Sequence, residues 1–129
     1  YFTHATETII WAAKNKQSKH RFNYELMKGM NNNKQMKSIW PITAPGWEEK
    51  TFGKHPTQKP LALLERIILA STRKGDIVLD PFSGSATTGL AAYRHGRNYI
   101  GIELEKEYLD LSIKRFNLQT KNLPALVKV

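Results

Sequence analysis

Residues 80–89 read DPFSGSATTG, and this short stretch decides the fold class. The four residues up to Asp80 (IVLD) are short and apolar, as a buried strand is. The residues from about Ala86 to His95 include many small ones and predict a helix, which the following Gly96 would close with a left-handed cap. Residues 98–102 (NYIGI) predict a second strand. A strand, loop, helix and strand in this order make a crossover unit of a parallel sheet, so we expect an α/β fold.

Two further helices are expected beside this unit. Pro60 suits a first helical position because it has no amide hydrogen, and residues 61–70 are apolar around most of a helix. A final amphipathic helix is expected after Glu103, with Leu109, Ile113 and Phe116 on its apolar face. Two parallel strands do not complete a doubly wound sheet. The fold is therefore expected to be incomplete in this chain.

The first 53 residues are less regular. Residues 7–13 (ETIIWAA) predict a buried strand, whereas residues 21–28 (RFNYELMK) fit either a strand or a short helix. Residues 29–37 contain three consecutive asparagines and predict an exposed loop. Residues 39–51 predict an irregular, partly packed connection. We expect one domain, with residues 1–53 as a strand and loop region and residues 54–129 as the α/β region.

Composition excludes several classes of protein. The sequence has no cysteine, which excludes disulfides, thiolate metal sites and cysteine nucleophiles, and no metal site is expected. No apolar stretch approaches the ~20 residues of a membrane-spanning helix. No signal-peptide pattern opens the sequence, and we expect a cytoplasmic protein.

The charge balance favours a polyanionic partner. Lysine and arginine total 20 against 11 acidic residues, a net charge of +9. Such an excess attracts polyanions, of which nucleic acid is the commonest. Basic residues gather between residues 14 and 37, where Glu25 is the only acid. The expected phosphate contacts are Lys14, Lys16, Lys19 and Arg21; the alternative is a solvated basic face.

The quoted loop joins the end of a strand to the start of a helix, where open α/β sheets bind ligands. Gly84 allows close approach of the backbone, and the helix start favours an anionic group. Asp80 can accept hydrogen bonds from an ammonium group, and Glu103 can accept them from both hydroxyls of a ribose. An ammonium, a carboxylate and a ribose together describe S-adenosylmethionine.

Two other interpretations fit the same loop. Gly84-x-Ala86-x-x-Gly89 is one substitution from the dinucleotide-binding fingerprint, and Glu103 has the spacing that this fingerprint needs. The small residues could also serve only tight packing of the helix on the strand. The loop by itself leaves all three interpretations open.

A second segment distinguishes them. Residues 55–61 read HPTQKPL, which resembles the tenth motif of DNA methyltransferases, and residues 80–88 resemble their first motif, DPFxGSGTT. The order, with Glu103 as the second motif after both, is similar to the β group of DNA N6-adenine and N4-cytosine amino-methyltransferases. A dinucleotide site predicts nothing about residues 55–61. The chain thus resembles the carboxyl-terminal half of this group, which implies a Rossmann-like S-adenosylmethionine-dependent methyltransferase fold.

The resemblance implies a donor site built from both motifs. Asp80 would hold the donor's ammonium group and Glu103 its ribose. The methionine part and the rest of the donor would be lined by Phe82, Ser83, Gly84 and Ser85. The family usually has glycine where this sequence has Ala86, so the added methyl group could alter the loop.

The tenth motif would reach the donor's carboxylate through Thr57 and Lys59, with His55 as a weaker candidate. His55 could instead only stabilise a turn, and Lys59 could be a solvated charge.

The resemblance also implies a missing part. Catalysis needs a fourth motif, (Asp, Asn or Ser)-Pro-Pro-(Tyr, Phe or Trp), which binds the target amino group and stacks on the flipped base. No two prolines are adjacent in this sequence, so no catalytic residue is expected in it. In the β group this motif precedes the eighth, which residues 6–28 resemble.

We therefore expect a companion segment or subunit that carries the motif and the missing strands. The isolated chain is then expected to be inactive.

The expected partners are double-stranded DNA, this companion and, as a further possibility, a second copy of the chain. The expected target is adenine N6 rather than cytosine N4, within a restriction–modification context, although the pocket that discriminates the two bases is not in this sequence. The alternative function is a non-catalytic remnant that binds the donor or DNA.

Overall fold

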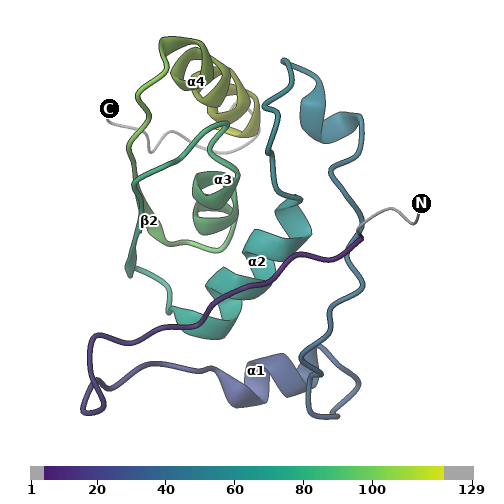
Figure 1. Ribbon diagram of the computed structural model, residues 1–129, viewed down its shortest axis with the longest axis vertical. Helices are drawn as coiled ribbons and strands as arrows, with labels where there is room; N and C mark the ends of the chain where they lie inside the picture. Colours follow the sequence, from purple (N-terminus) through teal and green to yellow (C-terminus); the bar gives the residue numbers. More distant parts are fainter. Residues whose placement is uncertain (1–4, 121–129) are drawn as a thin grey trace.

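The computed structural model describes residues 5–120 (Figure 1). Its elements, in chain order, are α1 (Tyr24–Gly29), the short 3-10 helix η1 (Glu48–Lys50), α2 (Leu61–Ser71), β1 (Ile77–Asp80), α3 (Thr87–Arg94), β2 (Asn98–Gly101) and α4 (Lys106–Thr120). None of the helices in this range is long and apolar enough to cross a lipid bilayer.

The two strands pair in parallel, with Ile77 opposite Asn98 and Asp80 opposite Gly101. Helix α3 connects them, so the predicted crossover unit is confirmed. Gly96 follows α3 with φ of 73°, the left-handed conformation that its position predicted. Helix α2 begins at Leu61, one residue later than predicted, because Pro60 has an extended ψ of 140° and caps the helix.

The core lies between the helices and one face of the two strands. Ile68 of α2 and Ala91 and Ala92 of α3 are buried together, and Val78 and Tyr99 of the strands pack against them. Small side chains on α3 let its backbone approach the strands closely. The apolar side chains that the sequence predicted on α2 form part of this cluster through Ile68 and pack against it through Leu61 and Leu64.

The prediction of a buried strand at residues 77–80 is wrong for one of the two faces of that strand. Ile77, Leu79, Ile100 and Ile102 are 66%, 61%, 52% and 56% exposed. Successive side chains of a strand point to opposite faces, and in residues 5–120 helices cover only one face of this sheet. The apolar outer face, defined here as these four side chains, therefore lies open.

The predicted strand at residues 7–13 is wrong as well. This segment is extended and exposed, and it crosses in front of α2 in Figure 1 without joining the sheet. A strand needs a neighbour for its backbone hydrogen bonds, and the described part of the chain offers none there. Trp11 packs its ring against His20 and Phe22 instead, at centroid distances of 5.3 and 5.6 Å.

The open alternative at residues 21–28 resolves as a helix. Asn23, just before α1, fastens it to the end of α2: its amide donates to Ala70 O at 2.8 Å and its side chain to Leu69 O and Thr72 O at 2.7 and 2.8 Å. The expected loop at residues 29–37 is present from residue 30, directly after α1, and it is largely exposed.

The expected partly packed connection at residues 39–51 is also present. Arg66 stacks over the Trp40 ring with 5.0 Å between guanidinium carbon and ring centroid, whereas Trp47 is 79% exposed.

The predicted apolar face of α4 is wrong for Leu109 and Ile113 but not for Phe116, whose ring stacks on Tyr99 with 6.0 Å between centroids. Leu109 and Ile113 are 43% and 47% exposed, while Leu111, Ser112 and Arg115 are buried. The hydrogen bonds of Arg115, described below, contribute to the orientation of this helix. Apolar periodicity could not predict that orientation.

Candidate functional site

The loop after β1 is a tight turn with two left-handed residues. Gly84 has φ of 51° and Ala86 has φ of 57°, and the Ala86 amide donates to Ser83 O at 2.7 Å. The Ser83 amide donates to Ile102 O at 2.9 Å, which fastens the loop to the end of β2. The left-handed conformation costs an alanine about 1–2 kcal/mol, and glycine would avoid this cost. This strain gives a physical reason for the glycine that the family usually has in place of Ala86.

Glu103 closes the loop from the next strand. One carboxylate oxygen accepts from the Gly84 amide at 2.7 Å, and the other accepts from the Glu105 amide at 2.9 Å. The hydrogen bond from Glu105, followed by that from Gly84, lowers the pKa of Glu103, although partial burial opposes the shift. Each carboxylate oxygen has a further lone pair, so Glu103 can still accept from a ligand.

His55 lies directly over the loop. A side-chain carbon added at Gly84 would be 3.0 Å from His55 Nε2, so glycine is required there for this approach. The His55 ring also meets the edge of Tyr108 on α4, with 4.2 Å between centroids. His55 Nδ1 accepts from the Thr57 amide at 3.3 Å, so the turn-stabilising role is present. The ring nevertheless stands at the rim of the loop, where a bound molecule would meet it.

The other predicted ligand residues lie less close together. Asp80 accepts from the Phe82 amide at 3.2 Å, and the Phe82 ring is 89% exposed beside the loop. Lys59 turns toward Glu7, with 2.7 Å between Nζ and the carboxylate. Both side chains of this ion pair are largely exposed, and such pairs contribute little stability, so Lys59 is free to exchange partners.

A polar network beneath the loop was missed from the sequence. Arg115 of α4 donates through Nη1 to Ser85 O at 2.5 Å, Ser85 Oγ at 2.9 Å and Thr87 Oγ1 at 3.0 Å. Ser85 Oγ in turn donates to Gln58 Oε1 at 3.2 Å, which joins the loop to residues 55–61. The available signal was the spacing of Tyr108, Ser112 and Arg115, which places three polar groups on one helix face. A basic residue toward the end of a helix is also expected from the helix dipole alone, so no separate sign in the sequence indicated that Arg115 is buried.

Comparison with known proteins decides the family. The sequence profile of the N6/N4 DNA methylase family matches residues 1–114. The chain belongs to this family. The chain is 60% identical over 117 residues to the type II methyltransferase M2.MboI of Moraxella bovis, and 57% identical over 122 residues to M2.DpnII of Streptococcus pneumoniae. These alignments cover 91% and 94% of this chain but 43% and 46% of the relatives, so the chain spans less than half of their length.

Solved structures agree. The crystal structure of the M1.HpyAVI–SAM complex matches with a TM-score of 0.64 at 49% identity, over 79% of this chain and 46% of that one. The PvuII DNA methyltransferase, described as cytosine-N4-specific, matches with a TM-score of 0.53 at 29% identity, over 80% and 36% of the two chains. The predicted family and the partial Rossmann-like fold are confirmed, and S-adenosylmethionine is the cofactor of this family.

In this member of the DNA methylase family, the contacts of Gly89 support the interpretation that small residues here allow tight packing of the helix on the strand. A side-chain carbon at Gly89 would overlap the Tyr99 ring of β2 and lie 2.7 Å from Phe116 of α4. The third glycine position of the near-fingerprint therefore serves helix packing.

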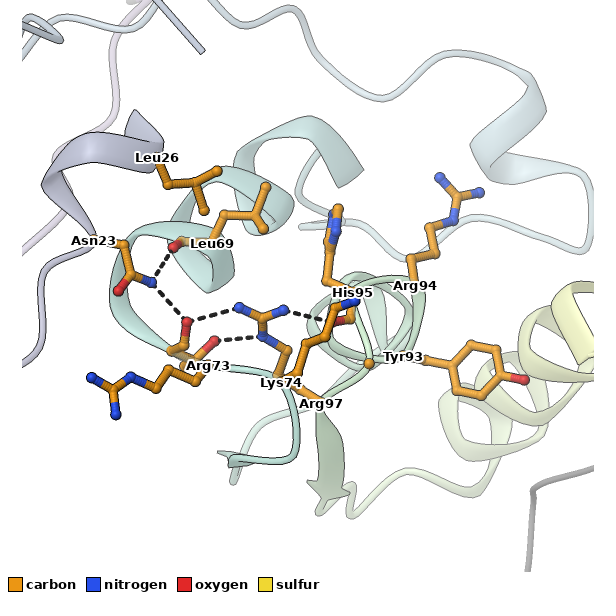
Figure 2. Close-up of a pocket in the computed structure, with 11 residues that line it drawn as sticks. Asn23, Leu26, Leu69, Arg73, Lys74, Tyr93, Arg94, His95 and Arg97 are labelled. Atoms are coloured by element: carbon orange, nitrogen blue, oxygen red, sulfur yellow. Dashed lines mark hydrogen bonds between the residues drawn. The ribbon is translucent and has the colours of Figure 1, made fainter. Parts of the chain in front are cut away.

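A groove of about 830 Å³ lies at the other end of this methylase chain, among α1 and the ends of α2 and α3 (Figure 2). The Arg97 guanidinium stands at its base and donates to Thr72 O at 2.7 Å, Thr72 Oγ1 at 2.9 Å and His95 O at 2.5 Å. These carbonyls follow two helices, whose ends carry negative partial charge, so Arg97 needs no carboxylate. The hydrogen bonds of Arg97 therefore hold the ends of the two helices together, at the base of the groove.

The predicted phosphate contacts also lie toward that end. Lys14, Lys16, Lys19 and Arg21 precede α1, which is fastened to the end of α2, and the bend that holds them lies at the bottom of Figure 1. The loop after β1 lies at the opposite, carboxyl ends of the strands. The structure thus does not bring the basic residues and the loop together, and their contact with DNA stays a prediction.

Proposed function

We propose that this chain is the donor-binding half of a DNA methyltransferase that moves a methyl group from S-adenosylmethionine to an exocyclic amino group. The observation that carries the proposal is the strained turn after β1, held by the Glu103 carboxylate and covered by His55. The family match supports the choice of donor over a dinucleotide.

The residues present fit this donor. The open edge of the turn offers the exposed Phe82 ring for packing, and Asp80 offers a carboxylate for an ammonium group. Glu103 would accept from the ribose with its remaining lone pairs. The donor's carboxylate would be held by Thr57 and Lys59, after Lys59 leaves Glu7. The bound donor supplies the activated methyl group on its sulfonium.

A companion segment completes the enzyme in this proposal. It would carry the fourth motif, since no two prolines are adjacent here, and it would cover the apolar outer face of the sheet. The relatives are more than twice as long as the part that this chain matches, which leaves room for such a segment in one polypeptide. Residues 1–129 would then be part of a single methyltransferase domain.

Adenine N6 is the proposed target and cytosine N4 the second candidate. The solved enzyme described as cytosine-N4-specific is the more distant of the two structural matches, at 29% identity against 49%.

The test is transfer of a labelled methyl group to double-stranded DNA by the isolated chain, alone and mixed with segments that carry the Pro-Pro motif. We expect donor binding without transfer for the chain alone, and transfer after mixing. Transfer by the chain alone would refute the need for a companion. Donor binding that no such segment converts into transfer would favour the non-catalytic remnant.

A further inference from the structure

Arg115 is a buried cation without an acidic partner. It is 7% exposed, and no carboxylate within the described residues forms an ion pair with it. Burial lowers the pKa of its guanidinium, and the charge of Glu49, which lies beyond ion-pair distance, opposes this shift. A buried charge is costly unless hydrogen bonds replace its hydration. All three acceptors that offset this cost belong to Ser85 and Thr87, at the end of the donor loop.

These acceptors lie at the most strained part of the backbone. Ser85 stands between Gly84 and Ala86, both left-handed, and Thr87 begins α3. Ala86 can leave its unfavourable conformation only if the Ser85 carbonyl moves, and that carbonyl is the acceptor of the shortest Arg115 bond. Arg115 therefore opposes relaxation of the turn.

The same serine connects the loop to the segment before α2. Ser85 Oγ accepts from Arg115 and donates to Oε1 of Gln58. Nε2 of the same Gln58 side chain donates to Glu49 O at 2.9 Å. The Glu49 carboxylate then accepts from the Leu61 amide at 2.9 Å, at the start of α2. One guanidinium thus fixes both parts of the proposed donor site relative to each other.

We propose that Arg115 is a positioning residue for the methyl donor. It holds the turn at Ser85 in the left-handed geometry that the donor needs, and through Gln58 it sets the distance from the turn to residues 55–59. Arg115 acts from beneath the loop and touches no reacting atom. This inference rests on the proposed function of the loop.

The test is donor affinity in the intact protein that contains this chain, measured by titration calorimetry with S-adenosylmethionine. Arg115→Lys keeps the charge, but the lysine side chain is one bond shorter than the path to Nη1, the single nitrogen that donates all three bonds, so the ammonium cannot reach the three acceptors in the same geometry. We expect donor affinity to fall by about tenfold or more, as for loss of a charge-assisted hydrogen bond. Affinity for DNA in the absence of donor is expected to stay unchanged.

The matched control is Arg94→Lys, an arginine on α3 that bonds Gln119 of the same α4 but no loop residue. It is expected to leave donor affinity unchanged. A cycle with Ser85→Ala separates positioning from general stability, because two changes that act through one contact are not additive. We expect the double variant to bind the donor about as weakly as the weaker single variant.

Three outcomes overturn the inference: wild-type affinity in Arg115→Lys, an equal loss in Arg94→Lys, or additive losses in the cycle. If Arg115→Lys does not fold, the Ser85→Ala variant decides the route through Ser85 Oγ to Gln58, since it leaves the carbonyl acceptor in place and unchanged affinity there excludes that route. Failure of the wild-type protein to bind the donor would instead refute the proposed function itself.

Discussion

Single residues shape the loop after β1 in two ways: by allowing a left-handed backbone and by connecting the loop to its neighbours. Gly84 is required by both its left-handed φ and the His55 ring above it, and Glu103 ties the loop to the next strand. Motif spacing in the sequence singled out both residues as donor contacts, whereas the contacts that the structure gives them within the loop were not predicted. The role of Arg115 was not predicted either, because a charge near a helix end has the same sequence signature whether it is solvated or buried.

Glu103→Ala is expected to weaken binding of S-adenosylmethionine by about 1–3 kcal/mol, the size of a charge-assisted hydrogen bond. Calorimetry on the intact protein measures this change, with Glu107→Gln in the exposed first turn of α4 as the control. Equal affinity in Glu103→Ala and the control would contradict the assigned ribose contact.

Donor binding should also depend on pH through Glu103. Its pKa is lowered in the folded protein, so its hydrogen bonds are fully present above the ordinary carboxylate range and are lost only as the pH falls through the lowered pKa. Wild-type donor affinity should therefore be constant near neutral pH and decline below about pH 4. Glu103→Gln should abolish this contribution to the decline; an unaltered acid profile in the variant would exclude Glu103 as its source.

The burial of the Tyr99 side chain can be tested through its effect on stability at alkaline pH. Burial, with a smaller contribution from the charge of Asp80, raises the pKa of Tyr99 to about 12, against a weaker opposing interaction with the Ser83 side chain. Within ordinary limits of distance and angle, the hydroxyl makes no hydrogen bond among the described residues. The neutral phenol therefore stabilises the fold below about pH 10, and this contribution is lost as the pH rises toward 12. Tyr99→Phe should leave the free energy of unfolding near pH 7 unchanged or raise it by about 1 kcal/mol.

The variant should also lose less stability than wild type between about pH 10 and about pH 11. Denaturant unfolding at both ends of this range measures the difference. A parallel alkaline decline in the two proteins would mean that Tyr99 is not its source.

At the scale of elements, periodicity predicted the crossover unit and α2 but not the orientation of α4. The strands and α2 bury apolar side chains, which a sequence pattern reports. The hydrogen bonds of Arg115 contribute to the orientation of helix α4, whose Leu109 and Ile113 stay exposed. The segment at residues 7–13 has strand-like composition but no neighbour to pair with among the residues that the structure describes. Pairing is a property of the assembled sheet, so a local pattern cannot supply it.

Gly89→Ala tests the contact among α3, β2 and α4. Alanine normally favours a helix by up to about 1 kcal/mol over glycine, but here its methyl group would overlap the Tyr99 ring. We expect a decrease of roughly 1–3 kcal/mol in the free energy of unfolding, as for an overpacked core. Gly46→Ala, where the added carbon has no neighbour within 4 Å, is the control. Equal stability of the two variants would contradict the packing described for α3.

At the scale of the whole molecule, the apolar outer face is a surface that no element within residues 5–120 covers. Ile77, Leu79, Ile100 and Ile102 together form the kind of continuous apolar patch that soluble proteins cover. We interpret it as the seat of the companion segment. The sequence predicted the missing part from an absent motif, and the open face supports the same proposal from packing.

Leu79→Asn in the intact protein tests this interpretation. Although Leu79 is 61% exposed in this chain, we expect the variant to lower the free energy of unfolding by about 2–4 kcal/mol, as at a buried site. Ile39→Asn, at a side chain that is 82% exposed and away from the sheet, should cost less than about 0.5 kcal/mol. An equally small effect at Leu79 would show that the face stays open.

The basic end of the molecule has its own test. Replacing Lys14, Lys16 and Lys19 with glutamine should weaken DNA binding by a similar factor on all sequences, if these side chains meet phosphates. The slope of log affinity against log salt concentration should become shallower by about 0.9 for each phosphate that a lysine no longer neutralises. An unchanged slope would assign the three lysines to a solvated face.

A crystal structure of the intact protein with S-adenosylmethionine tests the central claim most directly. We predict the donor across the turn at residues 80–86, with its ribose hydroxyls on Glu103 and its carboxylate toward Thr57 and Lys59. A donor bound anywhere else in the crystal, or with its ribose away from Glu103, would contradict the account.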